Sequence, residues 1–280
     1  MSLPPEDVHF LQSLLTGARA PWPEHWQAWY LHGHAEPLGL LPSSRAVLLE
    51  QSLPTHTPLV REAHGWVWHA DKLSMKQRSA ILQNLSHDLS VRGLLPGWRD
   101  ETHACWGALQ AHWPYKSPEL LRLERAAFRY WGLSSHASHI HGITADGRMW
   151  CGRRATSKAT DPGMLDNLAA GGLPADEDPL GCALREIQEE AGLIRTARQL
   201  LPCPIRLVTE REEPQGWHSE RLFVFSTWVA EHETPVNQDG EVSEFLCLEI
   251  PQVLQRMRSG EFTHDAACSI AVFLLSQENR

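Results

Sequence analysis

The spacing of apolar positions divides the chain into alternating helical and extended segments. Apolar residues three and four positions apart predict helices over residues 7–15, 21–29, 74–89, 117–131, 180–191, 251–257 and 266–275. Extended apolar or β-branched runs between turn residues predict strands over residues 65–69, 138–144, 149–153, 205–209, 222–229 and 242–249. Asp146-Gly147 lies between two of these strands and is typical of a hairpin turn.

The two halves of the chain differ in character. Eight of the 12 tryptophans precede residue 115, among short helical and extended pieces. We expect them to be mainly core residues, with a stacking surface for a flat ligand as the alternative. The pattern predicts a small α+β domain over residues 1–132 and, over residues 133–280, an α/β/α sandwich with a mixed sheet.

Composition limits the kind of partner. The formal net charge of −9 argues against a nucleic-acid surface, and hydrophobic residues make up 42% of the chain, as in ordinary globular proteins. No apolar run reaches the roughly 18 residues of a membrane span, and no signal sequence is recognisable at the start. The six cysteines form no C-x-x-C pair, so we expect reduced thiols. These features predict a cytoplasmic protein with a small-molecule substrate and no membrane or nucleic-acid partner; a homodimer stays open.

Carboxylates gather on the helix predicted over residues 180–191. Glu186, Glu189 and Glu190 point roughly 125° away from its apolar stripe at about 100° per residue, which predicts a narrow exposed acidic sector. Like charges this close favour a bound cation, and carboxylate oxygens suit Mg²⁺ or Mn²⁺. Arg185 precedes Glu189 by four residues and is placed to reach back to Glu177.

The alternative is a solvated acidic helix that ends at Gly192. However, Gly171, five residues, Glu177, seven residues and then Arg185-Glu-Ile-Gln-Glu-Glu-Ala-Gly-Leu193 match every defined position of the Nudix signature. The chain therefore resembles a Nudix hydrolase. The resemblance implies a Nudix α/β/α sandwich and Mg²⁺-assisted hydrolysis of a diphosphate attached to another group.

Further strings resemble one Nudix subfamily, the C-terminal half of fungal thiamine pyrophosphokinase fusions and certain plant chloroplast enzymes. They lie at residues 138–142, 149–154, 161–166 and 237–245. Trp98-Arg-Asp-Glu101 is similar to a string in the domain that precedes the Nudix domain there. The chain departs from the subfamily at His141 and Ile143, where Asn and an aromatic residue are usual. The resemblance implies hydrolysis of oxidised or damaged thiamine diphosphate to the monophosphate.

This interpretation assigns roles to particular side chains. Glu186, Glu189 and Glu190 are the expected metal ligands, and Gly171, Glu177, Arg185 and Gly192 are structural. The residues that serve as candidates for the general base are Glu186, Glu189, Glu241 and Glu244. Candidate contacts to the substrate are Arg153, Arg154 and Lys158 for phosphate, and Trp98 or Trp66 for a ring.

Other functions remain open from sequence. ADP-ribose or a dinucleotide is an alternative substrate. An isopentenyl-diphosphate isomerase would need a reactive thiol, for which Cys151 is the candidate, and a non-catalytic Nudix-fold binding protein would be expected to lack box carboxylates. His136, His139 and His141 are expected to be strand and turn residues, because no companion cluster completes a tetrahedral metal site.

Overall fold

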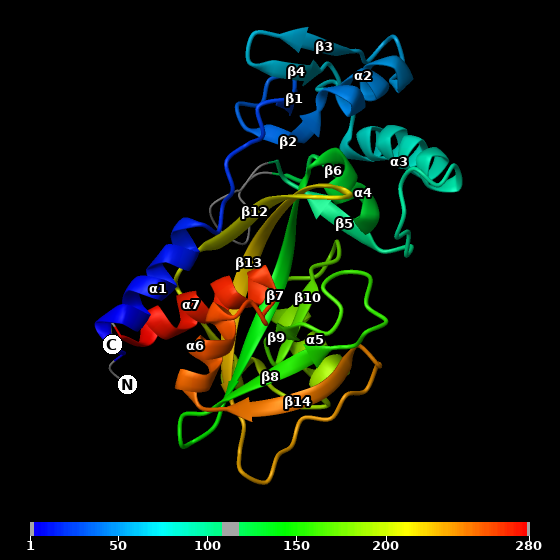
Figure 1. The fold of residues 1–280 in the computed structure, drawn as a ribbon. Helices are drawn as coiled ribbons and strands as arrows, with labels where there is room; N and C mark the ends of the chain where they lie inside the picture. Colours follow the sequence, from blue (N-terminus) through cyan, green and yellow to red (C-terminus); the bar gives the residue numbers. More distant parts are fainter. Residues whose placement is uncertain (1–2, 108–117, 279–280) are drawn as a thin grey trace.

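The computed structural model describes residues 3–107 and 118–278, which form two lobes (Figure 1). The first lobe contains a four-stranded sheet of order β2-β1-β4-β3. Its elements are β1 (Trp26–Leu31), β2 (Pro37–Pro42), α2 (Ser43–Ser52), β3 (Leu59–Glu62), β4 (Gly65–Trp68), α3 (Met75–Val91), β5 (Thr102–Cys105), β6 (Leu121–Glu124) and α4 (Arg125–Trp131). Strands β5 and β6 form a separate antiparallel pair.

The second lobe is built on an eight-stranded sheet. Its strands are β7 (Ser134–Ile143), β8 (Met149–Arg154), β9 (Leu165–Asp166), β10 (Ala169–Gly172), β11 (Leu201–Pro202), β12 (Leu207–Glu213), β13 (Gly216–Trp228) and β14 (Val242–Leu248). The central order is β11-β13-β7-β8-β14, with β9, β10 and β12 pairing on β8, β7 and β13. Only the β13–β7 pair among these is parallel, so the sheet is mixed, as expected.

Helices cover both faces of this sheet, which confirms the expected sandwich. Side chains alternate along β13: Leu222 and Val224 face one core, and Phe223 and Phe225 face the other. The first core is closed by α6 (Ile250–Arg258) and α7 (His264–Glu278), and the second by α5 (Pro179–Ala191). Among the described residues no helix is long and apolar enough to span a membrane.

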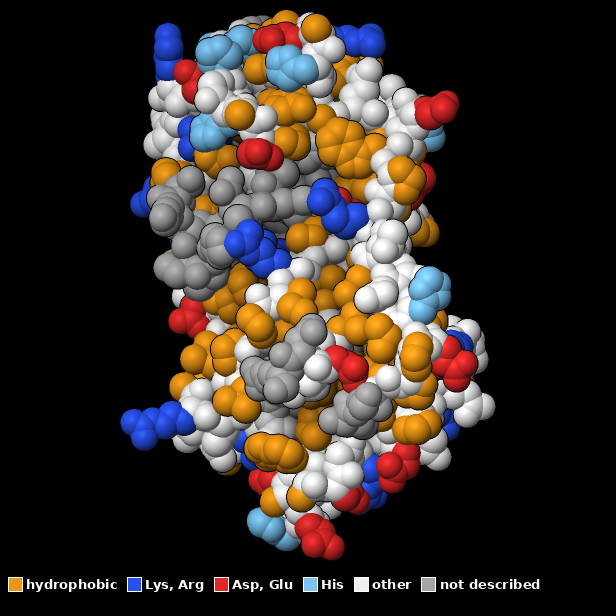
Figure 2. Space-filling view, turned by 90° about the vertical axis from the view of Figure 1, so that its left-hand side faces the viewer, with side chains coloured by type: hydrophobic (Ala, Val, Ile, Leu, Met, Phe, Trp, Pro, Cys, Tyr) orange, Lys and Arg blue, Asp and Glu red, His pale blue; other side chains and the backbone are white. Residues whose placement is uncertain are grey.

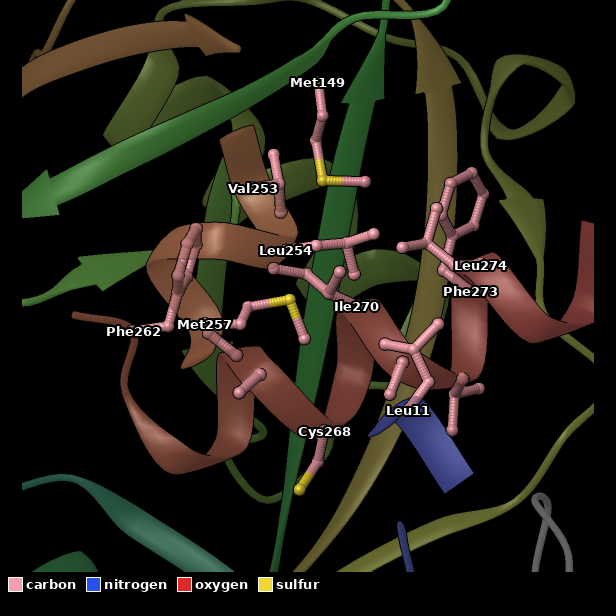
Figure 3. Close-up of a cluster of buried hydrophobic side chains, with 14 of the residues drawn as sticks. Leu11, Met149, Val253, Leu254, Met257, Phe262, Cys268, Ile270, Phe273 and Leu274 are labelled. Atoms are coloured by element: carbon pink, nitrogen blue, oxygen red, sulfur yellow. The ribbon is translucent and has the colours of Figure 1, made fainter. Parts of the chain in front are cut away.

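The helix α1 (Pro5–Thr16) belongs structurally to the second lobe, although it begins the chain. It lies beside α7 (Figure 1). Leu11 is fully buried and reaches the cluster of α6 and α7 side chains (Figure 3). Residues near the start of the chain thus complete the core of the lobe formed by its end. A division into domains at residue 132 stays a prediction.

The first lobe has its own core, and tryptophans fill it. Trp29, Trp68 and Trp131 are fully buried, and each indole N–H donates to a buried oxygen: the carbonyls of Trp131 and Thr57, and the hydroxyl of Ser86. These rings serve packing, as expected for most of them.

One predicted helix of this lobe is wrong, and a second is right only in its last part. Residues 26–31 form the strand β1, which lies between β2 and β4. Both faces of this strand are buried, so tryptophans are accommodated at any spacing and their spacing does not indicate a helix. Residues 121–124 form β6, and only Arg125–Trp131 is helical; residue 117 lies outside the described residues. The helix predicted over residues 7–15 is confirmed as α1, which begins two residues earlier, at Pro5. The helix predicted over residues 74–89 is confirmed as α3, with Ser74 in a capping box.

Candidate functional site

The acidic helix α5 begins and ends where local chemistry requires. Asp178 caps its first turn by accepting a hydrogen bond from the backbone N–H of Gly181 at 2.7 Å. Gly192 ends it with a φ of 65°, a left-handed conformation that glycine adopts without steric cost. These two caps explain why α5 begins at Pro179 and ends at Ala191.

Arg185 ties the turn to the helix, as the spacing predicts. Its guanidinium donates to both carboxylate oxygens of Glu177, at 3.1 and 2.9 Å. It also contacts Glu186 at 2.6 Å and Glu189 at 3.0 Å. One guanidinium thus orients three carboxylates, and a bidentate pair of this kind is geometrically specific.

The predicted exposed acidic sector is wrong for two of its three members. Glu189 is exposed, whereas Glu186 and Glu190 are buried. The helix is rotated so that Cys182, Ala183 and Ile187 form its buried face; Leu180 and Leu184 are only partly buried. Ile187 and Ala191 of the predicted apolar stripe are buried as expected, but the buried face also includes Glu186 and Glu190.

Burial brings the carboxylates onto strand β10. Glu190 accepts a hydrogen bond from the backbone N–H of Ala170 at 2.9 Å. Glu186 lies directly against Gly171, where a Cβ atom would be 1.9 Å from its Oε1. The glycine of the signature is therefore required by a close approach of side chain to strand.

Two like charges in a buried position are electrostatically costly. Burial, and then the neighbouring Glu186, raise the pKa of Glu190 well above its ordinary value. Burial also raises the pKa of Glu186, an effect that Arg185 opposes. A hard divalent cation would remove this cost, so the residues present fit Mg²⁺ or Mn²⁺.

The two later candidates for a base lie in different surroundings. Glu241 forms an ion pair with Lys158, and its charge contributes to raising the pKa of Glu186, which places it near the acidic cluster. The side chain of Glu244 is 48% exposed on β14 and pairs with Arg153. Of these two predicted candidates, Glu241 is therefore the one whose charge acts on the acidic cluster.

A cavity of about 320 Å³ lies between the lobes, next to this acidic cluster. Its wall on the second lobe includes His139, Ala170 and Gly171. On the first lobe it is lined by residues before β5 and by helix α4, among them Arg99 and Arg125. On the face drawn in Figure 2, Lys and Arg side chains lie at the waist between the lobes.

The predicted phosphate contacts are only partly placed in this cavity. Arg154 and Lys158 line it, but Arg153 does not. Arg154 pairs with Asp166 at 3.0 Å and donates to the carbonyl of Thr160, and Lys158 pairs with Glu241. These cations are therefore already engaged with protein oxygens.

Neither tryptophan proposed for the ring lies in the cavity wall. The indole N–H of Trp98 donates to Asp100 at 2.8 Å, and its ring packs on His87. Trp66 is in the core of the first lobe and donates to Gln27 at 2.7 Å. Among the residues that the structure describes, the aromatic ring in the lining is that of Phe128, accompanied by histidines.

Sequence reasoning missed a polar cluster at the other end of the cavity. Ligand atoms of His218, Glu220 and Asp265 lie within 4.8 Å of one another, a spacing compatible with a metal ion. However, Arg211 binds both oxygens of Asp265 at 2.8 and 3.2 Å, and Arg129 contacts His218 Nδ1 at 2.9 Å. Guanidinium groups already balance this cluster, so it fits a divalent cation poorly. Its members come from β13 and α7, and no sequence spacing could reveal them.

The three histidines of β7 do not converge on a common site. His139 hydrogen bonds to Asn167 at 2.7 Å, and His141 donates to the carbonyl of Ser269 at 3.2 Å. His136 packs against Phe223. Cys151 is fully buried in the core beneath α6 and α7, and burial raises the pKa of its thiol, so it is unsuited to the reactive role that an isomerase would need.

The chain is similar in sequence to known proteins over its second half and beyond. Residues 136–266 match the model of the NUDIX domain family. Nudix hydrolase 20, chloroplastic, from Arabidopsis thaliana is 30% identical over 200 residues, 70% of this chain and 52% of that protein. Nudix hydrolase 24, chloroplastic, from the same plant is 29% identical over 201 residues, 70% and 53%. The chain thus spans about half the length of these curated relatives. Among solved structures, the MutT protein from Methanosarcina mazei Go1 is 17% identical over 52% of this chain and 96% of that chain, with a TM-score of 0.40.

Proposed function

We propose that this protein is a Nudix hydrolase that hydrolyses a diphosphate linkage joined to an organic group, since residues 136–266 match the NUDIX domain. One observation carries the proposal. The complete signature set from Gly171 to Gly192 folds into a crowded carboxylate cluster beside an inter-lobe cavity rich in arginine.

Glu186, Glu189 and Glu190 would hold Mg²⁺ or Mn²⁺. When bound, such an ion neutralises phosphate oxygens and lowers the pKa of water. The protein's own contribution is positional: Arg185 orients Glu177, Glu186 and Glu189, and Ala170 fixes Glu190. A carboxylate near this cluster, Glu189 or Glu241, would accept the proton from the attacking water.

Within this class, we propose oxidised or damaged thiamine diphosphate as the preferred substrate, with the monophosphate and phosphate as products. The support is the resemblance of the strings at residues 161–166 and 237–245, and a cavity that offers Phe128 beside hydrogen-bond acceptors such as Glu220. The same acceptors suit an adenine amino group, so ADP-ribose or a dinucleotide is the second candidate. A cytoplasmic location and a lack of nucleic-acid or membrane partners stay predictions.

A substrate panel tests the proposal. Thiamine diphosphate, its oxidised form, ADP-ribose and a diadenosine polyphosphate would be compared with Mg²⁺, and phosphate and monophosphate would be assayed separately. The proposal predicts the highest kcat/KM for oxidised thiamine diphosphate, with one phosphate released per monophosphate. A higher kcat/KM for ADP-ribose would contradict the thiamine assignment, and no hydrolysis of any diphosphate would contradict the class.

A further inference from the structure

We propose that Arg99 and Arg125, both from the first lobe, form a clamp for the diphosphate group and complete a site that the second lobe alone leaves open. The inference deepens the proposed function, on which it rests for the identity of the ligand. It assigns the first lobe a substrate-binding role through its arginines, in place of the aromatic contact expected from sequence.

Both arginines line the cavity next to the acidic cluster. The Cζ atom of Arg125 would lie 3.7 Å from a methyl group at Gly172, the residue next to the one that Glu186 touches. The charges of Arg99 and Arg125 both act on Glu241. The pair thus borders the same cavity as Ala170 and Gly171, the β10 residues that contact Glu190 and Glu186.

These two arginines retain more unused donors than the other cations lining the cavity. Arg211 and Arg129 are each bound by carboxylates, and Arg154 and Lys158 are engaged as described above. Arg125 has a single ion pair, to Glu101 at 3.1 Å, and its side chain is 45% exposed. Within residues 3–107 and 118–278, the guanidinium of Arg99 has no ion pair or hydrogen bond. Five N–H donors on each planar group match the oxygens of phosphate.

A buried carboxylate fixes the backbone that carries the two arginines. Glu124 is 1% exposed and accepts hydrogen bonds from the backbone N–H groups of Arg99 and Glu101, both at 3.0 Å, and of Ala126 at 3.4 Å. The backbone N–H of Arg125 in turn donates to the carbonyl of Glu101 at 2.8 Å. The loop that carries Arg99 and the first turn of α4 that carries Arg125 are therefore cross-linked.

Asp100 and Glu101, which lie directly after Arg99, also help to position the two arginines. Asp100 has a φ of 58°, which turns the chain sharply between Arg99 and Glu101. His103 and Arg125 hold the pKa of Glu101 at about 2, against its burial, so this carboxylate stays ionised as the partner of Arg125. The fixed backbone of both residues, and the ion pair of the Arg125 side chain with Glu101, lower the entropy cost of ordering these residues on a bound phosphate. The string Trp98-Arg-Asp-Glu101 thereby receives a physical role: it presents one clamp residue and anchors the other.

The direct test measures binding of methylenediphosphonate, a non-hydrolysable diphosphate, by titration calorimetry with Mg²⁺ present. We expect Arg99→Gln and Arg125→Gln each to raise its Kd by about 10- to 100-fold, the range for a lost charge-assisted hydrogen bond. KM for a diphosphate substrate should rise in parallel, with a smaller change in kcat. Arg125→Lys should recover part of the affinity, because lysine keeps the charge and loses the planar fork.

Further variants show whether a loss of affinity comes from the clamp, from unfolding or from the absence of diphosphate hydrolysis. Arg61→Gln, on exposed β3 of the same lobe, should leave Kd and KM unchanged. Arg99→Gln is the decisive variant if Arg125→Gln unfolds, since Arg99 has no side-chain partner to lose among the described residues. Unchanged Kd and KM in folded Arg99→Gln would overturn the clamp while leaving hydrolysis intact. Clamp-dependent binding without hydrolysis of any diphosphate would overturn the proposed function alone.

Discussion

A methyl group on Gly171 would lie 1.9 Å from Oε1 and 2.0 Å from Cδ of Glu186. Atoms that are not bonded cannot approach so closely, so an added methyl group would force the flexible end of the Glu186 side chain to move. The absence of a side chain at residue 171 is therefore a condition for the position of Glu186.

The variant Gly171→Ala tests this relationship. Its Cβ should displace the carboxylate of Glu186 from the site, so we expect kcat for diphosphate hydrolysis to fall by about 100-fold or more, equivalent to roughly 2.7 kcal/mol in the barrier. Steady-state kinetics at saturating Mg²⁺ measure the change. Gly181→Ala is the matched control within the same motif, because its nearest neighbours would be at 3.4 and 3.5 Å, an ordinary contact distance. Comparable losses in both variants would show that the approach to Glu186 is not the reason for glycine.

A second prediction concerns the contribution of α1 to the second lobe. Leu11 is fully buried against α6 and α7, so Leu11→Ala should lower the free energy of unfolding by about 2–5 kcal/mol, measured by denaturant titration. A chain that begins at Ser134 should be destabilised for the same reason, since it lacks this helix. Val91→Ala, at a position 73% exposed, is the control and should change stability by less than about 0.5 kcal/mol. An equally small effect at Leu11 would mean that α1 is dispensable for the core.

A third prediction follows from the buried histidine His141. Burial, aided by His139, lowers its pKa to about 3, whereas the unfolded chain has the ordinary value near 6.5. Between these values the unfolded state binds a proton that the native state does not, so stability is present above pH ~6.5 and is lost as the pH falls toward 3. This one group contributes a slope of up to about 1.4 kcal/mol per pH unit.

Unfolding free energies measured from pH 7 to pH 4 test this slope. His141→Asn should reduce this slope by up to about 1.4 kcal/mol per pH unit, the contribution of one proton. The variant's absolute stability will also change, because Phe273 and Ser269 lose their neighbour. His56→Asn, at an exposed position, controls for the removal of a histidine as such. A slope unchanged in His141→Asn would contradict a neutral buried ring.

Sequence predicted the second lobe well because its signals are local. The hairpin at Asp146-Gly147, the capped helix α5 and the contact of Arg185 with Glu177 each depend on residues close in sequence. The burial of Glu186 and Glu190 was not predictable in this way. It depends on how strand β10 approaches the helix, which apolar spacing does not encode.

The first lobe was harder to predict for a related reason. The spacing of Trp26 and Trp29 suits a helix, yet pairing with β2 and β4 makes this segment a strand buried on both faces. Arg125 had no distinguishing neighbour pattern, because its place in the cavity depends on Glu101 and on Gly172 of the other lobe. Both the strand β1 and the position of Arg125 thus depend on contacts between residues far apart in sequence.

Glu190→Gln probes the acidic cluster without disturbing its packing. Loss of one charge from the cluster should lower kcat by about two orders of magnitude or more, because charge neutralisation by a divalent ion accounts for several kcal/mol of the barrier. The metal-free variant should be no less stable than the parent chain, since Glu190 is buried beside another carboxylate. Glu50→Gln, exposed on α2, should leave both quantities unchanged.

We propose that diphosphate hydrolysis by this protein depends on a divalent cation bound by Glu186, Glu189 and Glu190. The most direct measurement is phosphate release from a diphosphate substrate by the full chain, titrated with Mg²⁺ or Mn²⁺ and then with EDTA, for the parent chain and for Glu190→Gln. We expect phosphate release to rise to a plateau with added metal and to stop in excess EDTA. In Glu190→Gln, it should respond more weakly to metal. Undiminished turnover in EDTA, or the same metal titration and kcat in folded Glu190→Gln, would contradict this proposal.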